Sequence, residues 1–195
     1  MSFFDQIKIE FLKLAPISDG EWARFVSLFK VKHYKKGEFF VTAGTYSTDF
    51  GFIEKGLFRF FYTTYEGEEF NQTFKKEFDY ILSFTSILLN EPSNFSIQAL
   101  EDSTIYVADY RDFEAFYHGN CDWQQLGRKI AELNFIIKTK KEESFLLYNA
   151  PERFEIFKNR YPEFLKRVPQ MHVASYLGIS AETLNRIIKK SKEVT

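Results

Sequence analysis

Charged and amide side chains near the carboxyl end of the chain recur at helical spacing and have the chemistry needed to recognise DNA bases. Glu182, Asn185 and Arg186 fall on one face of a helix, because side chains three or four residues apart are neighbours there. Arginine pairs with guanine, glutamate accepts from the cytosine amino group, and asparagine pairs with adenine. The residues expected to contact bases are Ser180, Ala181, Glu182, Asn185 and Arg186.

Basic and amide side chains on either side of that face predict contacts to the DNA backbone. Each lysine or arginine that neutralises a phosphate releases a bound counterion, so such contacts weaken steeply as salt is added. The residues expected to contact phosphates are Arg167, Gln170, Lys189, Lys190 and Lys192.

Two short helices joined by a turn must position these residues. Val173, Ala174 and Leu177 share an apolar face of the first helix. Gly178 follows, where a helix commonly ends in a left-handed residue, and Ser180 is the expected N-cap of the second helix. The apolar face of that second helix comprises Thr183, Leu184, Ile187 and Ile188. The pattern is typical of a helix-turn-helix, and the alternative is a helical hairpin whose charged outer face is merely solvated.

The cysteine content and the apolar runs exclude several classes of protein. The single cysteine of the 195 residues, Cys121, allows no internal disulfide and no cysteine-ligated cluster or structural zinc site within one chain. We therefore expect neither a cofactor nor a metal. No apolar run approaches the ~20 residues of a membrane span, and the first ten residues lack a signal-peptide pattern. A cytoplasmic protein without a membrane partner is the expectation.

The net charge of −1 conceals an asymmetry along the chain. From Asp122 onward the chain has 14 lysines and arginines against 9 aspartates and glutamates, whereas the residues before it have 12 against 18. The basic part is the one that contains the helix-turn-helix pattern. This placement favours a polyanionic partner for the carboxyl-terminal part, namely double-stranded DNA.

The residues before Asp122 predict a jelly roll preceded by helices. Helical patterns cover Phe3–Leu14 and then a segment from Ser18 to about Lys30, where Glu21 would complete a capping box. From Val31 to Tyr110 the period changes to two, with short runs separated by glycine-containing turns. The expected strands are Glu38–Thr42, Asp49–Lys55, Leu57–Thr64, Glu68–Phe74, Ser96–Ala99 and Ser103–Asp109. Asp79–Leu89 is expected to begin as a strand and to end as a short helical turn. Many short strands of this kind indicate an α+β protein with an amino-terminal jelly-roll barrel.

A long helix is expected to follow a short one at Asp112–Tyr117. It would begin at Asp122 as N-cap and continue to about Tyr148, before Pro151. Its apolar side needs a surface to bury against, and a second copy of the chain is the preferred one over a purely intramolecular contact. The expected dimer-interface residues are Leu126, Ile130, Leu133 and Ile137. The expected domains are residues 1–121 (sensor roll), 122–149 (dimerisation helix) and 150–195 (helix-turn-helix).

The order of these parts resembles the Crp/Fnr (cyclic-AMP receptor protein) family of bacterial transcription regulators. The residues that carry the resemblance are Lys36–Glu38, Gly44, Ile53–Arg59 and Ala99–Asp102 in the roll, and Val168–Gln170 and Leu177–Ile187 in the helical part. The resemblance implies a homodimer whose roll senses a signal and whose second motif helix enters the major groove. It places Glu182 and Arg186 on the base-contacting positions of the family, and it makes RNA polymerase a further expected partner.

The cyclic-nucleotide site of the family is degenerate in this chain. Family members that bind cyclic AMP have a Gly-Glu pair and a later Arg-Ser or Arg-Thr pair, where this chain has Leu82-Ser83 and Ser93-Asn94. No arginine lies between Arg59 and Arg111, and a buried phosphate without a paired cation is costly. We expect weak or no binding of cyclic AMP. Residues that could bind another small effector are Ser83, Thr85, Ser86, Ser93 and Asn94. The alternative interpretation is that all five are ordinary loop residues.

The function that the sequence favours is a dimeric, sequence-specific DNA-binding transcription regulator. A catalytic jelly roll would need clustered histidines and a carboxylate, whereas His33, His118 and His172 are scattered and no His-x-His occurs. No catalytic residues are therefore expected, and the protein is not expected to be an enzyme. The alternative function is a ligand- or protein-binding jelly-roll module without DNA-binding activity.

Overall fold

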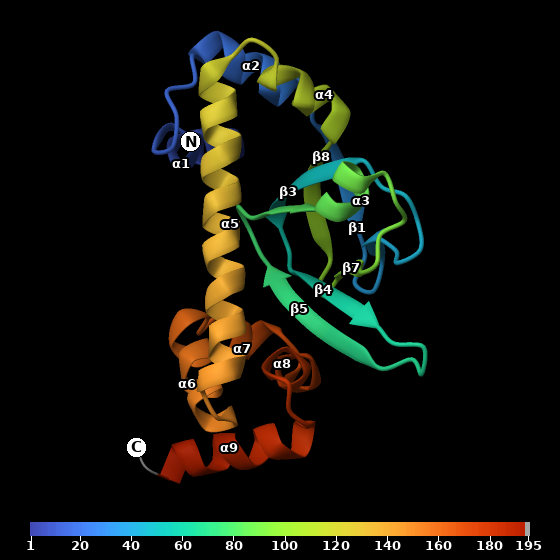
Figure 1. Cartoon of the computed structure of the whole chain (residues 1–195), viewed down its shortest axis with the longest axis vertical. Coiled ribbons are helices and arrows are strands. Elements are labelled where there is room, and N and C mark those ends of the chain that lie inside the picture. Colours follow the sequence, from blue (N-terminus) through green and yellow to red (C-terminus); the bar gives the residue numbers. More distant parts are fainter. Residues whose placement is uncertain (194–195) are drawn as a thin grey trace. The chain divides into compact units, whose positions relative to one another are not determined.

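The computed structural model of the chain describes residues 1–193, with side chains through Ser191. These residues form two compact units, and Figure 1 labels their α-helices and most of their strands. The first unit contains Met1–Arg59 and Phe74–Phe135, and the second contains Phe60–Thr73 together with the chain from Ile136 onward.

Within the described residues, eight strands form two four-stranded sheets. One sheet has the order β1-β8-β3-β6 and the other has the order β2-β7-β4-β5, which is the strand order of a jelly roll. The strands are β1 (Lys30–Tyr34), β2 (Phe39–Val41), β3 (Asp49–Lys55), β4 (Phe58–Thr63), β5 (Glu69–Lys75), β6 (Tyr80–Leu82), β7 (Ser96–Ala99) and β8 (Ser103–Asp109). Six of them were predicted, and β6 with α3 (Phe84–Leu89) confirms the strand that ends in a helical turn. The sequence pattern missed β1, which has only one half-buried position and no apolar alternation.

Alternation along β3 explains how the first sheet is buried on both faces. Phe50 and Phe52 belong to a cluster with the surrounding helices, while Ile53 and the Cα of Gly51 lie on the opposite face. A Cβ built on Gly51 would stand 2.8 Å from a methyl group of Ile105 on β8, so only glycine fits this close approach of the two strands. The interior of the roll is thus filled by side chains.

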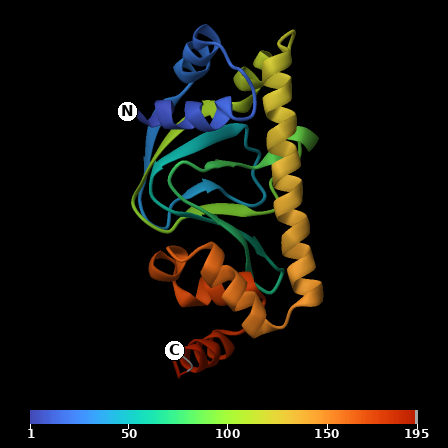
Figure 2. The same ribbon diagram turned by 90° about the vertical axis from the view of Figure 1, so that its left-hand side faces the viewer.

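Helices cover the outer face of the first sheet, and Figure 2 shows α1 (Phe3–Leu12) lying across it. The rings of Phe4, Phe25, Phe52, Phe113 and Trp123 form an aromatic cluster with centroid spacings of 5.1–6.4 Å. The helices that supply or flank these rings are α2 (Asp19–Ser27), α4 (Tyr110–Glu114), a 3-10 turn at Ala115–Tyr117 and the start of α5 (Cys121–Leu147). Large aromatic side chains bury the most area per residue, so this cluster dominates the stability of the first unit.

Two of the expected caps differ from the structure. Asn120 caps α5, because its Oδ1 accepts from the backbone N–H groups of Asp122 and Trp123, so Asp122 is not the cap. Ser18 does cap α2, but Glu21 completes no capping box. Its carboxylate instead accepts from the Trp123 indole N–H at 3.1 Å and from Arg24 at 2.8 Å. Glu21 therefore bonds the distant Trp123 side chain and not the backbone N–H of Ser18, which a capping box requires.

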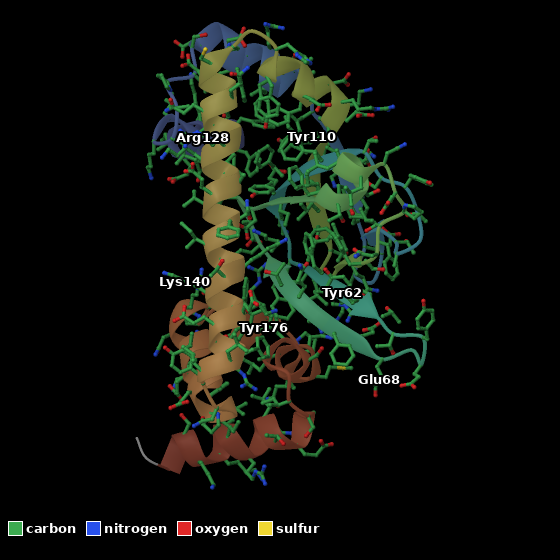
Figure 3. The ribbon with its side chains drawn as sticks, viewed as in Figure 1. Tyr62, Glu68, Tyr110, Arg128, Lys140 and Tyr176 are labelled. Carbon is green, nitrogen blue, oxygen red and sulfur yellow. The ribbon has the colours of Figure 1, made fainter. Side chains whose placement is uncertain are left out.

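The helices of the second unit follow one another closely after α5. They are α6 (Ala150–Arg160), α7 (Phe164–Arg167), α8 (Gln170–Leu177) and α9 (Ala181–Glu193). Asn149 caps α6 with a complete capping box to Glu152, and Pro151 lies in the first turn, where its missing N–H costs nothing. The same unit contains the hairpin of β4 and β5, whose turn includes Glu68 (Figure 3).

Candidate nucleic-acid interface

A three-residue turn joins α8 to α9 and fixes the angle between them. Gly178 has φ of +67°, and the N–H of Ile179 donates to the Ala174 carbonyl at 3.1 Å, as in a Schellman-type helix end. A Cβ on Gly178 would also stand 2.8 Å from the Phe145 ring. Both the backbone angle and the available space therefore require glycine here.

The start of α9 is capped as the sequence predicts. The Ser180 hydroxyl accepts from the Thr183 N–H at 3.2 Å, and the Ser180 carbonyl accepts from the Leu184 N–H at 3.0 Å. Leu184 is fully buried, and Ala174 on α8 is 2% exposed. Because the interior side of α9 is anchored by Leu184, its opposite side faces away from the helical core.

Three of the five side chains predicted to contact bases, Glu182, Asn185 and Arg186, lie on that opposite side of α9. Ser180, Glu182, Asn185 and Arg186 are exposed, and Ala181 is half-buried. The pKa of the Glu182 carboxyl is lowered by hydrogen bonds from its own backbone N–H and from Ser180, so the side chain is an anion at neutral pH. The first turn of α9 thus presents an acceptor, and the next turn presents an amide and a guanidinium donor.

The predicted phosphate-contacting residues divide into three groups. Gln170, Lys189 and Lys190 are exposed, as a contact to a DNA phosphate requires. Arg167 is half-buried at the end of α7 and already interacts with other residues of the chain. Lys192 lies beyond the described side chains. Two exposed cations, Lys189 and Lys190, therefore lie near the carboxyl end of α9.

Arg153 on α6 supports the turn, and sequence reasoning missed it. Its Nε donates to the Leu177 carbonyl at 3.1 Å and its Nη1 donates to the Tyr148 carbonyl at 2.8 Å, while the guanidinium lies 5.0 Å from the Phe145 ring centroid. These contacts tie the end of α8 to the end of α5. A single arginine in a polar helix turn gives no periodic signal, so only the fold reveals this role.

The serines proposed for effector binding hydrogen-bond within the first unit. Ser83 Oγ donates to Ser93 Oγ at 2.8 Å, Ser93 Oγ donates to the Phe95 carbonyl at 2.8 Å, and Ser86 Oγ donates to the Glu91 carbonyl at 2.6 Å. All three serines are buried, whereas Thr85 and Asn94 are exposed. The five residues therefore do not converge on one cavity. This favours the alternative that they are structural loop residues.

Two cations of the roll, Arg59 and Lys75, are also engaged by other side chains. Arg59 on β4 is 5% exposed and donates through Nε and Nη2 to Gln98 Oε1 at 2.8 and 2.6 Å. Lys75 pairs with Asp79 at 3.8 Å and lies 5.3 Å from the Tyr80 ring centroid. A cyclic phosphate would have to replace these contacts before it could be neutralised.

The four residues predicted for a dimer interface are not equivalent. Leu126 is fully buried in the aromatic core of its own chain, and Ile130 packs against that core, so the expectation that Leu126 contacts a second copy is wrong. Leu133 and Ile137 are 48% and 44% exposed, and Ile136 beside them is 48% exposed. The first apolar residues of α5 are therefore buried within their own chain, whereas those in the middle of the helix are exposed.

The described residues contain neither a cluster of possible metal ligands nor a helix that could span a membrane. No group of three or more His, Cys, Asp or Glu side chains is arranged to hold a metal ion. His33 Nδ1 lies 3.2 Å from Thr104 Oγ1, and His172 Nδ1 lies 3.5 Å from Asn71 Nδ2. In the same part of the chain, no helix has the length and apolar character needed to cross a membrane.

Comparisons with known proteins agree with the fold. Residues 31–120 match the cyclic nucleotide-binding domain, while no curated protein sequence matches the chain. The c-di-GMP-responsive regulator CLP of Xanthomonas campestris superposes with a TM-score of 0.71 at 11% identity, covering 90% of this chain and 92% of that chain. A CooA mutant of Carboxydothermus hydrogenoformans gives 0.67 at 18% identity, covering 95% and 84%. A crp/fnr-family protein of Eubacterium rectale gives 0.69 at 12% identity, covering 90% and 84%. These findings confirm that the chain resembles the Crp/Fnr regulators in fold.

Proposed function

We propose that this chain, which has the fold of the Crp/Fnr regulators, is a sequence-specific DNA-binding transcription regulator. The observation that carries the proposal is the exposed side of α9, where Glu182, Asn185 and Arg186 stand clear of the packing contacts made by Leu184. The likeness to solved regulators along nine-tenths of the chain supports it. The proposed DNA-binding domain is residues 150–195, which contain the proposed helix-turn-helix of α8 and α9.

Base reading would use the first two turns of α9. Arg186 would donate a bidentate pair to guanine, Glu182 would accept from a cytosine amino group, and Asn185 would meet a neighbouring base. Lys189, Lys190 and Gln170 are exposed on the flanks, where phosphates would lie. Because these phosphate contacts carry no sequence information, their loss should weaken binding to all DNA alike.

Two copies of the chain would bind a two-fold symmetric site. The exposed apolar side chains of Leu133, Ile136 and Ile137 on α5 would pack against the same residues of a second copy. Helix-turn-helix dimers read half-sites about 34 Å apart, which is one turn of DNA. A homodimer therefore accounts both for the uncovered seam and for the use of a single reading helix per chain.

The roll would respond to a partner or an effector other than cyclic AMP. Ser83 and Ser93 bond each other, Ser86 bonds the Glu91 carbonyl, and Arg59 is held by Gln98. CLP is described as c-di-GMP-responsive, and c-di-GMP is likewise an anion. Any anionic effector would compete with Gln98 for Arg59 in this chain. We place the protein in the cytoplasm with RNA polymerase as a further partner.

Selection of bound sites from random duplex DNA tests the proposal. Wild type should enrich a two-fold symmetric site, and Arg186→Ala should lose the base preference at one position of each half-site. Lys190→Ala is the matched control, because it removes an exposed cation from the same helix and should weaken specific and random DNA equally. Absence of any enriched site, with and without cell extract, would refute the proposal and favour a module that binds a ligand or a protein instead.

A further inference from the structure

Strand β5 is an edge strand, and a side chain of α8 satisfies its open edge. Among the described residues, the order β2-β7-β4-β5 leaves one side of β5 without a neighbouring strand. On β5, the Asn71 N–H donates to Ser175 Oγ at 2.9 Å, and the same hydroxyl donates to the Glu69 carbonyl at 2.8 Å. One serine hydroxyl therefore bonds two backbone groups that an additional strand would otherwise pair.

Lys141 on α5 makes a second connection to the same strand. Its Nζ donates to the Gln72 carbonyl at 2.5 Å and lies 4.1 Å from the ring centroid of Tyr176, the residue that follows Ser175. Figure 3 shows Tyr176 between α8 and α5. The lysine thus connects three elements of the second unit, which are the edge strand, the long helix and the first helix of the motif.

A third contact leaves one polar atom without a partner. Asn71 is 4% exposed, its Nδ2 faces His172 Nδ1 at 3.5 Å, and its Oδ1 has no hydrogen bond within the described chain. A buried acceptor without a donor destabilises the arrangement that buries it, and water would restore the bond on opening. Lys141 adds a second cost, because its ammonium forms no ion pair with a carboxylate among the described residues.

We propose that Ser175 is a positioning residue that couples the edge of the sheet to the reading helix. The contacts form what we call the hairpin–helix joint, made of Glu69, Asn71, Gln72, Lys141, His172, Ser175 and Tyr176. The inference rests on the proposed DNA-binding function, since it concerns where α9 is held. A displacement of β5 moves α8 with it, and α9 follows because the turn at Gly178 is fixed by its backbone and by Phe145.

The joint does not cover the reading side of α9. Glu182, Asn185 and Arg186 are exposed while the joint is closed, so closing it cannot block a half-site by occlusion. What it fixes is the direction in which each copy presents its reading helix. In a dimer on two half-sites, that direction sets the half-site spacing that both copies can reach together. Opening the joint should therefore relax the preferred spacing and leave the base preference within each half-site unchanged.

Amide hydrogen exchange tests the joint without DNA. Ser175→Ala removes the acceptor of the Asn71 N–H, whose exchange should become at least about tenfold faster, and Ser175→Thr should restore protection by returning the hydroxyl. Ser144→Ala is the matched control, because that hydroxyl bonds the Lys141 carbonyl within its own helix. Unchanged exchange at Asn71 in Ser175→Ala would overturn the inference.

Site selection from a library of half-sites separated by varied spacers tests the coupling. Wild type and Ser144→Ala should each prefer one spacer length. Ser175→Ala should enrich neighbouring spacer lengths to within about threefold of its best length, and it should keep the same half-site sequence. An unchanged spacer preference in Ser175→Ala, despite faster exchange at Asn71, would overturn the positioning role. If wild type selects no site at all, the proposed function fails instead, and the exchange result alone still decides whether the joint exists.

Discussion

The ammonium of Lys141 on α5 lies over the ring of Tyr176 on α8, 4.1 Å from its centroid, and has no carboxylate partner among the described residues. Burial lowers the pKa of Lys141 from 10.5 to about 8, and burial raises the pKa of the Tyr176 hydroxyl to about 12. The ring face and the Gln72 carbonyl stabilise the cation in part. They do so with partial charges alone, and an uncompensated charge is left inside the second unit.

Lys141→Met should stabilise the protein at neutral pH. Lys141 loses its proton near pH 8 in the folded chain and near pH 10.5 in the unfolded chain. Burial of the charged form therefore lowers the stability of the fold by its full amount below pH 8, and this loss disappears as the pH rises from 8 to 10.5. We expect the variant to gain ~1–3 kcal/mol at pH 7, with the difference from wild type shrinking between pH 8 and 10.5. Thermal unfolding across pH measures it.

Lys140→Met provides the control for this comparison, because Lys140 is an exposed neighbour on the same helix (Figure 3). Lys140→Met should change the free energy of unfolding by less than ~0.5 kcal/mol at both pH 7 and pH 10.5. A Lys141→Met protein that is less stable than wild type at pH 7 would mean that the carbonyl and ring contacts outweigh the burial of the charge.

Gly178→Ala should destabilise the chain more than Gly67→Ala. Both glycines have positive φ, +67° and +86°, so alanine is strained at either position. Only at Gly178 would the new Cβ also stand 2.8 Å from the Phe145 ring, whereas Gly67 has open space around it. We expect about 1 kcal/mol at Gly67 and roughly 2–4 kcal/mol at Gly178, measured by denaturant unfolding. Equal losses at the two sites would show that the ring yields freely.

Local signals in the sequence predicted the turn after α8 and the start of α9, because their determinants lie within a few residues of one another. Gly178, Ser180 and Leu184 each have a role that a one-turn window reveals. The role of Arg153 depends instead on carbonyl groups brought to it from Tyr148 and Leu177, which no local pattern encodes. The sequence could place the motif but could not show what supports it.

The apolar seam of α5 shows a second limit of sequence reasoning. Leu126 and Leu133 are one heptad apart, so periodicity gives them the same role, yet one is fully buried in its own chain and the other is 48% exposed. The difference arises from Phe25 and Phe113, which reach Trp123 and the start of α5 from distant parts of the chain. Likewise, Glu21 matched a capping box but bonds Trp123.

Substitutions on α5 should separate folding from dimerisation. Leu126→Ala leaves a cavity in the aromatic core and should cost ~2–5 kcal/mol of stability at a fixed protein concentration. Leu133→Ala exposes no core and should cost under about 1 kcal/mol by the same measure in the monomer. Sedimentation equilibrium should show that Leu133→Ala weakens self-association at least about tenfold. If Leu133→Ala associates like wild type, a face of the chain other than the exposed seam forms the dimer.

Cyclic AMP should bind with a dissociation constant of about 1 mM or weaker, because its phosphate would meet serine hydroxyls that already bond one another and no arginine on this loop. Isothermal titration calorimetry measures this directly, with adenosine as the matched ligand that lacks the phosphate. Ser93→Arg supplies a cation at the position that the resemblance matches to the arginine of cyclic-AMP-binding members, and should bind the nucleotide more tightly than wild type. Micromolar binding to wild type would show that the Ser83–Ser93 pair opens to admit a phosphate, and the roll would then be a nucleotide sensor after all.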